Sequence, residues 1–321
     1  MAHFLPSQTT SFLTSTPAPM KFGKIEDPQH VEFKLPPDSP ENANILKGAK
    51  GKPDIYIGCA KWNKSDLKNF YPKGTKDELA YYATQFNSIE LNATFYNNFP
   101  LETIDSWHTK TPEGFRFFPK LHQGISHWKR LKDADQPTSV YLDHISHLEE
   151  KLGMLFLQMP DNFGPKNWEV LRDYLEVWPS GFPLALELRH TGWYDGSWDN
   201  SELYTQLEKK NITHIITDTA GRRDLLHMRL TTPTAFIRYN GANVDSDYTR
   251  LDDWMDRLKL WVDQGIENIY FFVHQNHEEA SPLLSAYLIE KVNKEFGTDI
   301  KIPDTPGIPA KKGNSDQIGL F

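Results

Sequence analysis

Cysteine is almost absent from this chain of 321 residues, in which Cys59 is the only one. A single thiol can form neither an internal disulfide nor a cysteine-based zinc site. This usage favours a reducing compartment, and the N-terminus lacks the basic and then apolar segments of a secretory signal peptide. We therefore predict a cytoplasmic protein.

Long apolar runs are missing as well. No run of about 18 apolar residues occurs, so the sequence predicts no transmembrane helix and no membrane partner. Positive charge is also in deficit, because 35 Lys and Arg stand against 43 Asp and Glu, a formal net charge of −8 at pH 7. This balance excludes a protein that coats nucleic acid through bulk charge, but it allows a local basic patch.

Both ends of the chain lack regular hydrophobic patterning. Residues 1–50 are rich in Ser, Thr and Pro, and residues 303–321 are rich in Pro and Gly. Such composition sustains neither a helical nor a strand period, so we predict a disordered or extended leader and a flexible tail. Residues 51–302 remain as one large domain, and 38% hydrophobic residues suffice for its core.

The central region alternates strand-length apolar runs with amphipathic helical patterns. Eight such runs predict a single (β/α)₈ TIM barrel from about Ile55 to Pro303, because an open doubly wound sheet usually has fewer strands. No Gly-rich phosphate-binding motif follows the first run, which excludes a Rossmann fold. The predicted strands are 55–62, 88–96, 116–121, 154–159, 184–190, 214–219, 235–241 and 268–276.

Helical signals fill the gaps between these runs. Thr75 and Glu78 have the spacing of a capping box, and the pattern LDDWMDRLKLWVDQG ends at Gly265, which predicts a C-cap there. The pattern over 279–297 predicts the closing helix.

Polar and charged residues gather where the predicted strands end. In a barrel these ends form the active-site face, and a buried polar group without a partner costs several kcal/mol, so the residues must face one another, water or a ligand. We predict Glu90, Glu187, Asp218 and His190 as catalytic residues. The predicted substrate-binding residues at the strand ends are Lys61, Trp62, Asn92, Lys120, His127, Arg189, Arg238, Asn240 and Asn276.

The charges at these positions favour an anionic ligand. Lysines and arginines outnumber acids there, as suits a phosphate group or a sugar-phosphate backbone, and Arg222 and Arg223 in a loop add to them. The structural alternative is that Glu90 or Glu187 simply pairs with Arg238 or Arg189 inside the barrel.

Three chemistries could use these residues. Glu90 and Glu187 could act as acid and base in glycoside cleavage, which requires a separation that the sequence does not give. The acids and histidines at the strand ends could instead hold a divalent metal, but neither an H-x-H on the first strand nor H-E-x-x-H occurs, so a metal is not favoured. Nucleophilic catalysis is weaker, because Cys59 lies within a strand and no G-x-S-x-G elbow is present.

Several motifs resemble, in order, those of the YecE-like family, a TIM-barrel domain of unknown function. They are IGCAKW, FYP at 70–72, IELNATFY, KLHQGISH, ELRHTGW, Asp218, IRYNG and HQNH, over roughly residues 55–300. The resemblance implies a TIM barrel but no activity. It adds Tyr96 and Trp193 to the substrate-binding set, and its polar positions fall on Trp62, Glu90, Asn92, Thr94, Tyr96, Lys120, His127, Glu187, Arg189, His190, Trp193, Asp218, Arg238, Gly241 and Asn276.

The chain departs from the family pattern at three places. Ala60-Lys61 stands where Ser-Gly is usual, Asn240 replaces a histidine, and Gly192 replaces a serine. No histidine can therefore act at position 240, and Lys61 adds a positive charge to the predicted face.

The last residues match a second pattern. Gln317, Ile318, Leu320 and Phe321 are similar to the peptide by which bacterial proteins bind the sliding clamp, and they follow a Pro- and Gly-rich spacer. The alternatives are that Leu320 and Phe321 fold back onto the barrel or that the match arose by chance. Clamp binding would place the barrel on DNA, where Trp62, Tyr96, Trp128 and Trp193 could line a mouth for an unstacked nucleotide.

Three functions follow from these features. The first is an enzyme that acts on an anionic, phosphate-containing substrate, with nucleic-acid processing or repair through sliding-clamp association as its context. The second is a small-molecule isomerase or hydrolase of sugars or sugar phosphates, and the third is a non-catalytic binding module.

Overall fold

A computed structural model describes residues 25–48 and 51–306 and has an α/β fold with parallel sheets. The strands are β1 (Asp54–Cys59), β2 (Ser88–Leu91), β3 (Arg116–Pro119), β4 (Leu155–Gln158), β5 (Leu184–Glu187), β6 (Thr213–His214), β7 (Ile216–Thr219), β8 (Thr234–Gly241) and β9 (Asn268–Gln275). The α-helices are α1 (Asn42–Ile45), α2 (Glu78–Gln85), α3 (Ala93–Tyr96), α4 (Leu101–Lys110), α5 (Asp135–Ile145), α6 (Trp168–Glu176), α7 (Ser201–Lys209), α8 (Ser246–Gln264) and α9 (Ser281–Phe296).

The strands form two hydrogen-bonded sheets. The larger sheet has the order β3-β2-β1-β9-β8-β7, and the smaller has the order β4-β5-β6. Two isolated bridges, Phe117 with Leu152 and Lys120 with Phe156, join the chain around β3 to the chain around β4. At the other junction β6 and β7 follow each other in the chain with only Ile215 between them.

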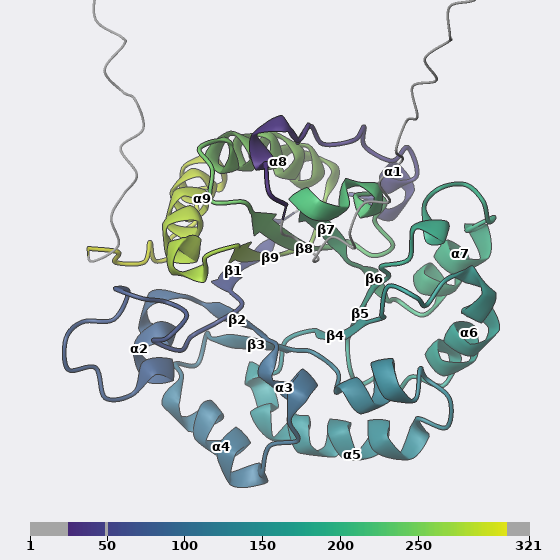
Figure 1. The fold of residues 1–321 in the computed structure, drawn as a ribbon, viewed down its shortest axis with the longest axis horizontal. Helices are drawn as coiled ribbons and strands as arrows, with labels where there is room; N and C mark the ends of the chain where they lie inside the picture. The colour runs from purple at the N-terminus through teal and green to yellow at the C-terminus, as the bar shows by residue number, and fades with distance from the viewer. Residues whose placement is uncertain (1–24, 49–50, 307–321) are drawn as a thin grey trace, which may run out of the picture.

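Figure 1 shows the strands around a common centre with most of the helices outside them. The predicted α/β class with parallel strands is confirmed. A single closed ladder is not found among the described residues, so the strand pairing does not confirm the predicted closed barrel. The predicted strand 214–219 is divided, because the chain pairs with β5 up to His214 and with β8 from Ile216 onward.

The predicted strand 88–96 is wrong in its second half, which forms α3. Its strand ends at Leu91, and the Thr94 hydroxyl donates hydrogen bonds to the carbonyls of Leu91 (3.0 Å) and Lys120 (2.8 Å). A threonine that bonds to nearby backbone carbonyls competes with the sheet ladder, and this turns the chain into a helix.

Apolar side chains pack on both faces of the strands. The inner cluster contains residues from both sheets, so the inner faces of the two sheets pack against each other. A larger cluster fills the space between the strands and the surrounding helices. The inner cluster consists of Phe118, Met154, Phe156, Ala185, Ile215, Phe236 and Phe272, with Tyr56 and Tyr270 against it.

The helix ends confirm one predicted cap and correct another. Gly265 ends α8 with a φ of 105°, a left-handed conformation that glycine adopts without strain. At the start of α2 the cap is Asp77, whose carboxylate accepts from the Ala80 N–H at 3.0 Å. The expected capping box fails because the Thr75 hydroxyl donates instead to the carbonyl of Pro72 in the preceding turn.

Residues 25–48 of the predicted leader pack against the outside of the fold. Arg223 donates hydrogen bonds to the carbonyls of Phe33 and Lys34, both at 3.1 Å. Asn42 is fully buried and donates to the carbonyl of Met228 at 2.7 Å. Within 25–48 and 51–306, no helix is both long and apolar enough to cross a membrane.

Candidate functional site

A cluster of polar side chains lies directly above the inner apolar cluster. Neighbouring residues of a strand point to opposite faces, so a residue two positions after an inner residue also points inward. Phe236 belongs to the inner cluster and Arg238 follows it by two positions, and the same spacing joins Phe156 to Gln158. The ionic cluster, as we call it, consists of Glu90, Lys120, Gln158, Glu187, Arg189, Arg238 and His274.

Arg238 is the centre of the ionic cluster. Its Nε and Nη2 donate to the two carboxylate oxygens of Glu90 at 2.8 and 2.7 Å, and its Nη1 donates to Glu187 Oε2 at 2.5 Å. Its guanidinium carbon lies 5.4 Å from the centre of the Phe156 ring. Such bidentate, charge-assisted bonds hold both carboxylates in fixed positions.

Hydrogen bonds extend this network from Glu187 to Lys120. Arg189 Nε donates to Glu187 Oε1 at 2.6 Å, and Gln158 Nε2 donates to Glu187 Oε2 at 2.9 Å. The other end of the Gln158 amide accepts from Lys120 Nζ at 2.6 Å. Three strands, β3, β4 and β5, therefore place their last residues, or those just beyond, in one hydrogen-bonded chain.

The charges around the two glutamates keep them ionised. Burial raises their pKa, but this effect is outweighed by the attraction of nearby cations, so both pKa values lie below the usual range, that of Glu187 at about 2. His274 Nε2 lies 3.1 Å from Glu90 Oε2, and this carboxylate helps to raise the pKa of His274 to about 9 despite burial. The imidazole is therefore a cation at neutral pH.

Lys120 differs from these groups because its charge is destabilised. Burial, followed by the repulsion of Arg238 and Arg189, lowers the pKa of Lys120 to about 7, although Glu187 and Glu90 act in the opposite direction. Within the ionic cluster this amine alone has a pKa close to neutral, which is the condition for a group that gains and loses a proton at working pH.

Two buried threonines lie on the inner face of β7, the same side of the larger sheet as Arg238 of the ionic cluster. Asp218 points outward to α8, so its neighbours Thr217 and Thr219 point inward, and Thr217 pairs in register with Arg238. Both threonine hydroxyls are buried and have no hydrogen-bond partner among the described residues. Leaving such a hydroxyl unpaired costs about 1–3 kcal/mol, so a ligand that bonds to it gains binding energy.

Asp218 does not join the predicted catalytic set. It accepts from Arg250 Nη2 at 2.9 Å and from Trp254 Nε1 at 2.8 Å, both on α8, and it pairs with Arg223. It therefore lies on the opposite face of β7 from the ionic cluster. These cations hold the pKa of Asp218 below its usual range, although burial raises it.

His190 and His127 lie apart from the two glutamates in the hydrogen-bond network. His190 Nδ1 accepts from the N–H of Gly192 at 3.0 Å, which makes the ring a cap for the short helical turn that follows. His127 packs edge-on against Phe95 at 4.8 Å, the ring whose centre lies 4.0 Å from Lys120 Nζ. Burial, then the charge of Lys120, lowers the pKa of His127 to about 4, so it is neutral.

The four aromatic residues predicted to line the mouth differ in burial. Trp193 is only 1% exposed and donates to the carbonyl of Phe163, so it is a core residue. Trp62 is partly buried and packs edge-on against Trp107 of α4. Tyr96 and Trp128 are exposed by 63% and 70%. Trp193 therefore does not line an open surface, whereas Tyr96 and Trp128 are accessible to a ligand.

The remaining predicted binding residues lie in different surroundings. Asn92 Nδ2 donates to Glu90 Oε1 at 2.6 Å and so belongs to the network, and Asn240 is partly buried two residues after Arg238. Asn276 lines a surface cleft of about 600 Å³ and a neighbouring one of about 440 Å³, and Lys61 lines the second. Lys61 Nζ lies 3.5 Å from Asp66.

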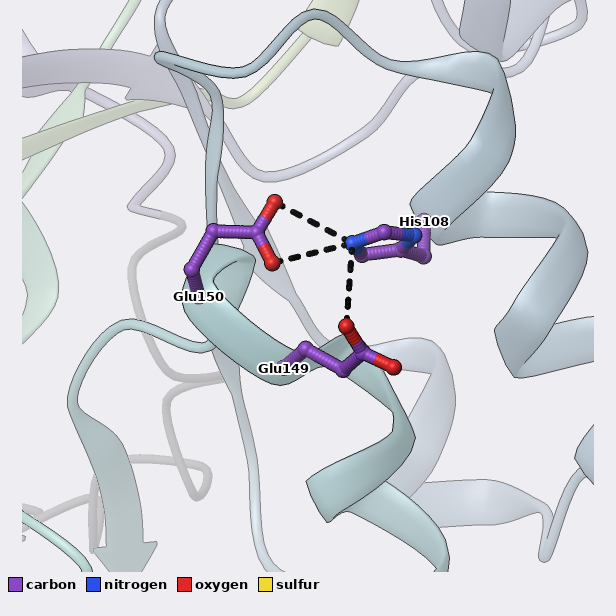
Figure 2. A group of neighbouring side chains, drawn as sticks. All are labelled: His108, Glu149 and Glu150. Carbon is purple, nitrogen blue, oxygen red and sulfur yellow. Dashed lines mark hydrogen bonds and ion pairs between the residues drawn. The ribbon is translucent and has the colours of Figure 1, made fainter.

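The pKa values of the two glutamates disfavour glycoside cleavage, and the geometry of the acids and histidines bears on metal binding. A carboxylic acid that protonates a glycosidic oxygen needs a raised pKa, whereas both Glu90 and Glu187 have lowered ones. The acids and histidines considered as metal ligands include one close pair, Glu90 and His274, whose Oε2 and Nε2 lie 3.1 Å apart, but no group of three with mutually close ligand atoms among the described residues. Among the described residues, the one group of three or more histidines and acids with mutually close ligand atoms is His108, Glu149 and Glu150, on the outer surface (Figure 2). There His108 Nε2 lies 3.1 Å from both Glu150 oxygens, within hydrogen-bond distance of each.

Sequence reasoning missed Gln158, Thr217 and Thr219 as members of the site and left His274 out of the catalytic set. The signal for Gln158 and Thr217 is their spacing of two residues from Phe156 and Ile215 of the inner cluster. Once the structure shows which residues form the inner cluster, this period selects them together with Arg238.

The fold and the ionic cluster define a parallel α/β protein with a buried polar centre at the carboxyl ends of its strands. In this centre the basic groups outnumber the acidic ones. A model of the family described as "Protein of unknown function DUF72" matches residues 56–308. The chain therefore belongs to the DUF72 family, which confirms the YecE-like resemblance.

Individual relatives agree with this assignment. The chain is 27% identical to the UPF0759 protein YecE of Escherichia coli K12 over 278 residues, 80% of this chain and 97% of YecE. It is 31% identical to the UPF0759 protein YunF of Bacillus subtilis over 151 residues, 44% of this chain and 52% of YunF. A solved DUF72 family protein of Thermotoga maritima is 26% identical with a TM-score of 0.59, covering 75% of this chain and 100% of that chain. One from Enterococcus faecalis, 18% identical with a TM-score of 0.58, covers 75% of this chain and 98% of that chain and supports the fold alone.

We expect Asp218→Asn to lower the free energy of unfolding by about 3 kcal/mol, because it removes the buried carboxylate that pairs with Arg223 and Arg250 and leaves Arg250 with Asp247 alone. Urea unfolding at pH 7 measures this loss. Asp256→Asn on the exposed side of α8 is the control and should change the free energy by less than about 0.5 kcal/mol. Equal values for the two variants would contradict a charge role for Asp218.

The raised pKa of His274 predicts a pH-dependent contribution to stability. A folded-state pKa of about 9 lies above the ordinary 6.5, so the contribution is full below about pH 6.5 and is lost as the pH rises through 9. The stability difference between wild type and His274→Gln should therefore shrink by up to about 3 kcal/mol from pH 6 to pH 9.5. Urea unfolding across this range tests it, with the exposed His277→Gln as a control that follows the wild-type curve. A constant difference would contradict the prediction.

Proposed function

We propose that this protein is an enzyme that acts on an anionic, phosphate-containing small molecule bound at the ionic cluster. The observation that carries the proposal is the pair of buried, unpartnered hydroxyls of Thr217 and Thr219, which face the same space as several basic groups. Unpaired buried donors beside cations suit the oxygen atoms of a phosphorylated ligand.

The charge balance of the site supports an anion. The basic groups are Lys120, Arg189, Arg238 and His274, and the carboxylates are Glu90, Glu187 and, at the rim, Glu278, whose Oε1 lies 3.7 Å from His274 Nδ1. Four basic groups thus stand against three acids when Lys120 is protonated. A bound anion would stabilise that protonated state, which couples ligand binding to the charge of the amine.

Catalysis rather than binding alone is supported by the division of roles within the cluster. Glu90 and Glu187 have lowered pKa values and act as fixed charges that orient Arg238 and Arg189. Lys120 has a pKa of about 7 and can exchange a proton near neutral pH. A binding module would need the fixed charges but no such titrating amine.

We further propose that the two sheets work as one (β/α)₈ barrel. The bridges between the chain around β3 and the chain around β4, together with the continuity of β6 and β7, support this geometry. The polar cluster then lies at the carboxyl end of the strands, where TIM-barrel enzymes carry their active sites.

A ligand test follows from the position of Arg189. Ribose 5-phosphate should raise the melting temperature of the wild type, and Arg189→Gln should weaken its affinity by about tenfold or more, because a charge-assisted contact is removed. Differential scanning fluorimetry over a range of ligand concentrations measures this, with each variant compared to its own ligand-free value.

Three comparisons make this test specific. Arg172→Gln removes an exposed arginine that pairs with Asp173 and should keep the wild-type shift. Unphosphorylated ribose should produce no shift, and a mononucleotide distinguishes nucleotide from sugar-phosphate recognition. The same shift with ribose as with its phosphate would rule out anion recognition.

The terminal residues carry a separate proposal. Gln317, Ile318, Leu320 and Phe321 lie outside the described residues, and their sequence alone supports association with a bacterial sliding clamp. A fluorescent peptide ending in QIGLF should bind such a clamp in a polarisation assay. A peptide with Leu320→Ala and Phe321→Ala is the control and should not bind, since both apolar anchors are removed. Equal polarisation for the two peptides would remove the support for a DNA context.

A further inference from the structure

We propose that Lys120 is a nucleophilic catalytic residue whose Nζ forms an imine with an aldehyde or ketone group of the substrate, an inference that rests on the proposed function of the ionic cluster. Such a role requires an accessible amine that is not neutralised by an ion pair, is unprotonated at working pH and lies beside groups that hold the rest of the substrate.

The contacts of Lys120 show that no ion pair neutralises its amine. Its Nζ donates to the neutral amide oxygen of Gln158 at 2.6 Å and lies 4.0 Å from the centre of the Phe95 ring. Within the described residues, no carboxylate oxygen lies within 4.0 Å of it, because Arg238 and Arg189 hold the carboxylates of the cluster. Lys120 directly follows β3, and the residue is 7% exposed.

Another buried lysine shows what a structural role looks like in this fold. Lys151 is 5% exposed, and its Nζ donates to the carbonyls of His108 and Thr111, both at 2.5 Å. Two backbone acceptors fix that ammonium in the core. Among the described residues Lys120 Nζ has one hydrogen-bond acceptor, the side-chain amide of Gln158, so its amine is held less completely and lies among the polar groups of the site.

The groups around Lys120 favour its unprotonated form at neutral pH. Burial and the nearby guanidinium groups lower the pKa of Lys120 to about 7, so a large fraction is the nucleophilic free amine at neutral pH, whereas an ordinary lysine is almost fully protonated. The titratable and charged groups that act on it are Glu90 on β2, His127 after β3, Glu187 and Arg189 at β5, and Arg238 on β8.

The bond changes are balanced without a further reagent. The Nζ lone pair attacks the carbonyl carbon and forms a carbinolamine, and the former carbonyl oxygen then leaves as water with the two protons that the amine nitrogen gives up. His127 packs against the same Phe95 ring and is a neutral imidazole, so it is placed to relay a proton between nitrogen and oxygen. The inward-facing Thr217 and Thr219 hydroxyls are the groups that bind the other oxygens of the substrate.

Reductive trapping tests the imine directly. The full chain is incubated with dihydroxyacetone phosphate, glyceraldehyde 3-phosphate or pyruvate and then treated with sodium borohydride, which reduces an imine to a stable secondary amine. Intact mass should rise by the mass of the carbonyl compound less one oxygen atom, and peptide mapping should place the adduct on Lys120. Adduct formation should rise with pH and reach half its maximum near pH 7.

Matched variants separate this inference from the proposed function. Lys120→Met should reduce the adduct by about tenfold or more, whereas Lys129→Met, at an exposed position nearby, should leave it unchanged. Peptide mapping of the wild type keeps the test valid even if Lys120→Met fails to fold. Thermal stabilisation by phosphorylated compounds with no adduct on Lys120, or an adduct spread over exposed lysines, would overturn the imine while keeping the anion site. Absence of both adduct and stabilisation would overturn both proposals.

Discussion

Arg238 joins the two halves of the structure through a single guanidinium group. It lies on β8 of the larger sheet, and it binds Glu90 on β2 of the same sheet and Glu187 on β5 of the smaller one. A buried ion pair adds little net stability compared with well-packed apolar groups, yet removing one partner is costly. The pairing therefore fixes how the sheets meet. Gln158 bonds to both Glu187 and Lys120 and so links the amine to the same network.

Sequence reasoning placed Glu90, Lys120, Glu187 and Arg238 at the strand ends, and the structure brings them into contact. The reason is that parallel strands bring their carboxyl ends to one side, which a strand count is enough to predict. The α/β class and the glycine that ends α8 were predictable on similar local grounds.

Asp218 shows where this reasoning stops. A shift of one residue moves a side chain to the other face of a sheet, and in the run Thr217, Asp218, Thr219 all three residues are polar, so no apolar alternation indicates which face is inside. Trp193 was misplaced for a related reason, since a tryptophan after a strand can line a pocket or fill the core. Its burial and the contact of its indole N–H with the carbonyl of Phe163 decide for the core.

The distribution of charge also changes how the acids are understood. Two buried glutamates suggest acid and base catalysis when only their positions are known. Once Arg238 and His274 are placed beside Glu90, the carboxylate becomes a permanent anion, and the group that can change its charge is the lysine. Glu90 and Glu187 can therefore be structural ion-pair partners of the arginines and still belong to a functional site. Their ion pairs hold the framework in which Lys120 lies.

The segment over residues 25–48 has a consequence for where the folding unit begins. The family match starts at residue 56, yet Asp38 accepts from the indole N–H of Trp261 at 2.9 Å and Asn42 accepts from the backbone N–H of Leu230 at 2.8 Å. A polypeptide trimmed to the family boundary would leave these donors, and the face of Arg250 that lies 4.1 Å from the centre of the Phe33 ring, open to water. The unit that evolution shares across the family is thus smaller than the unit that this chain needs to complete its own outer layer.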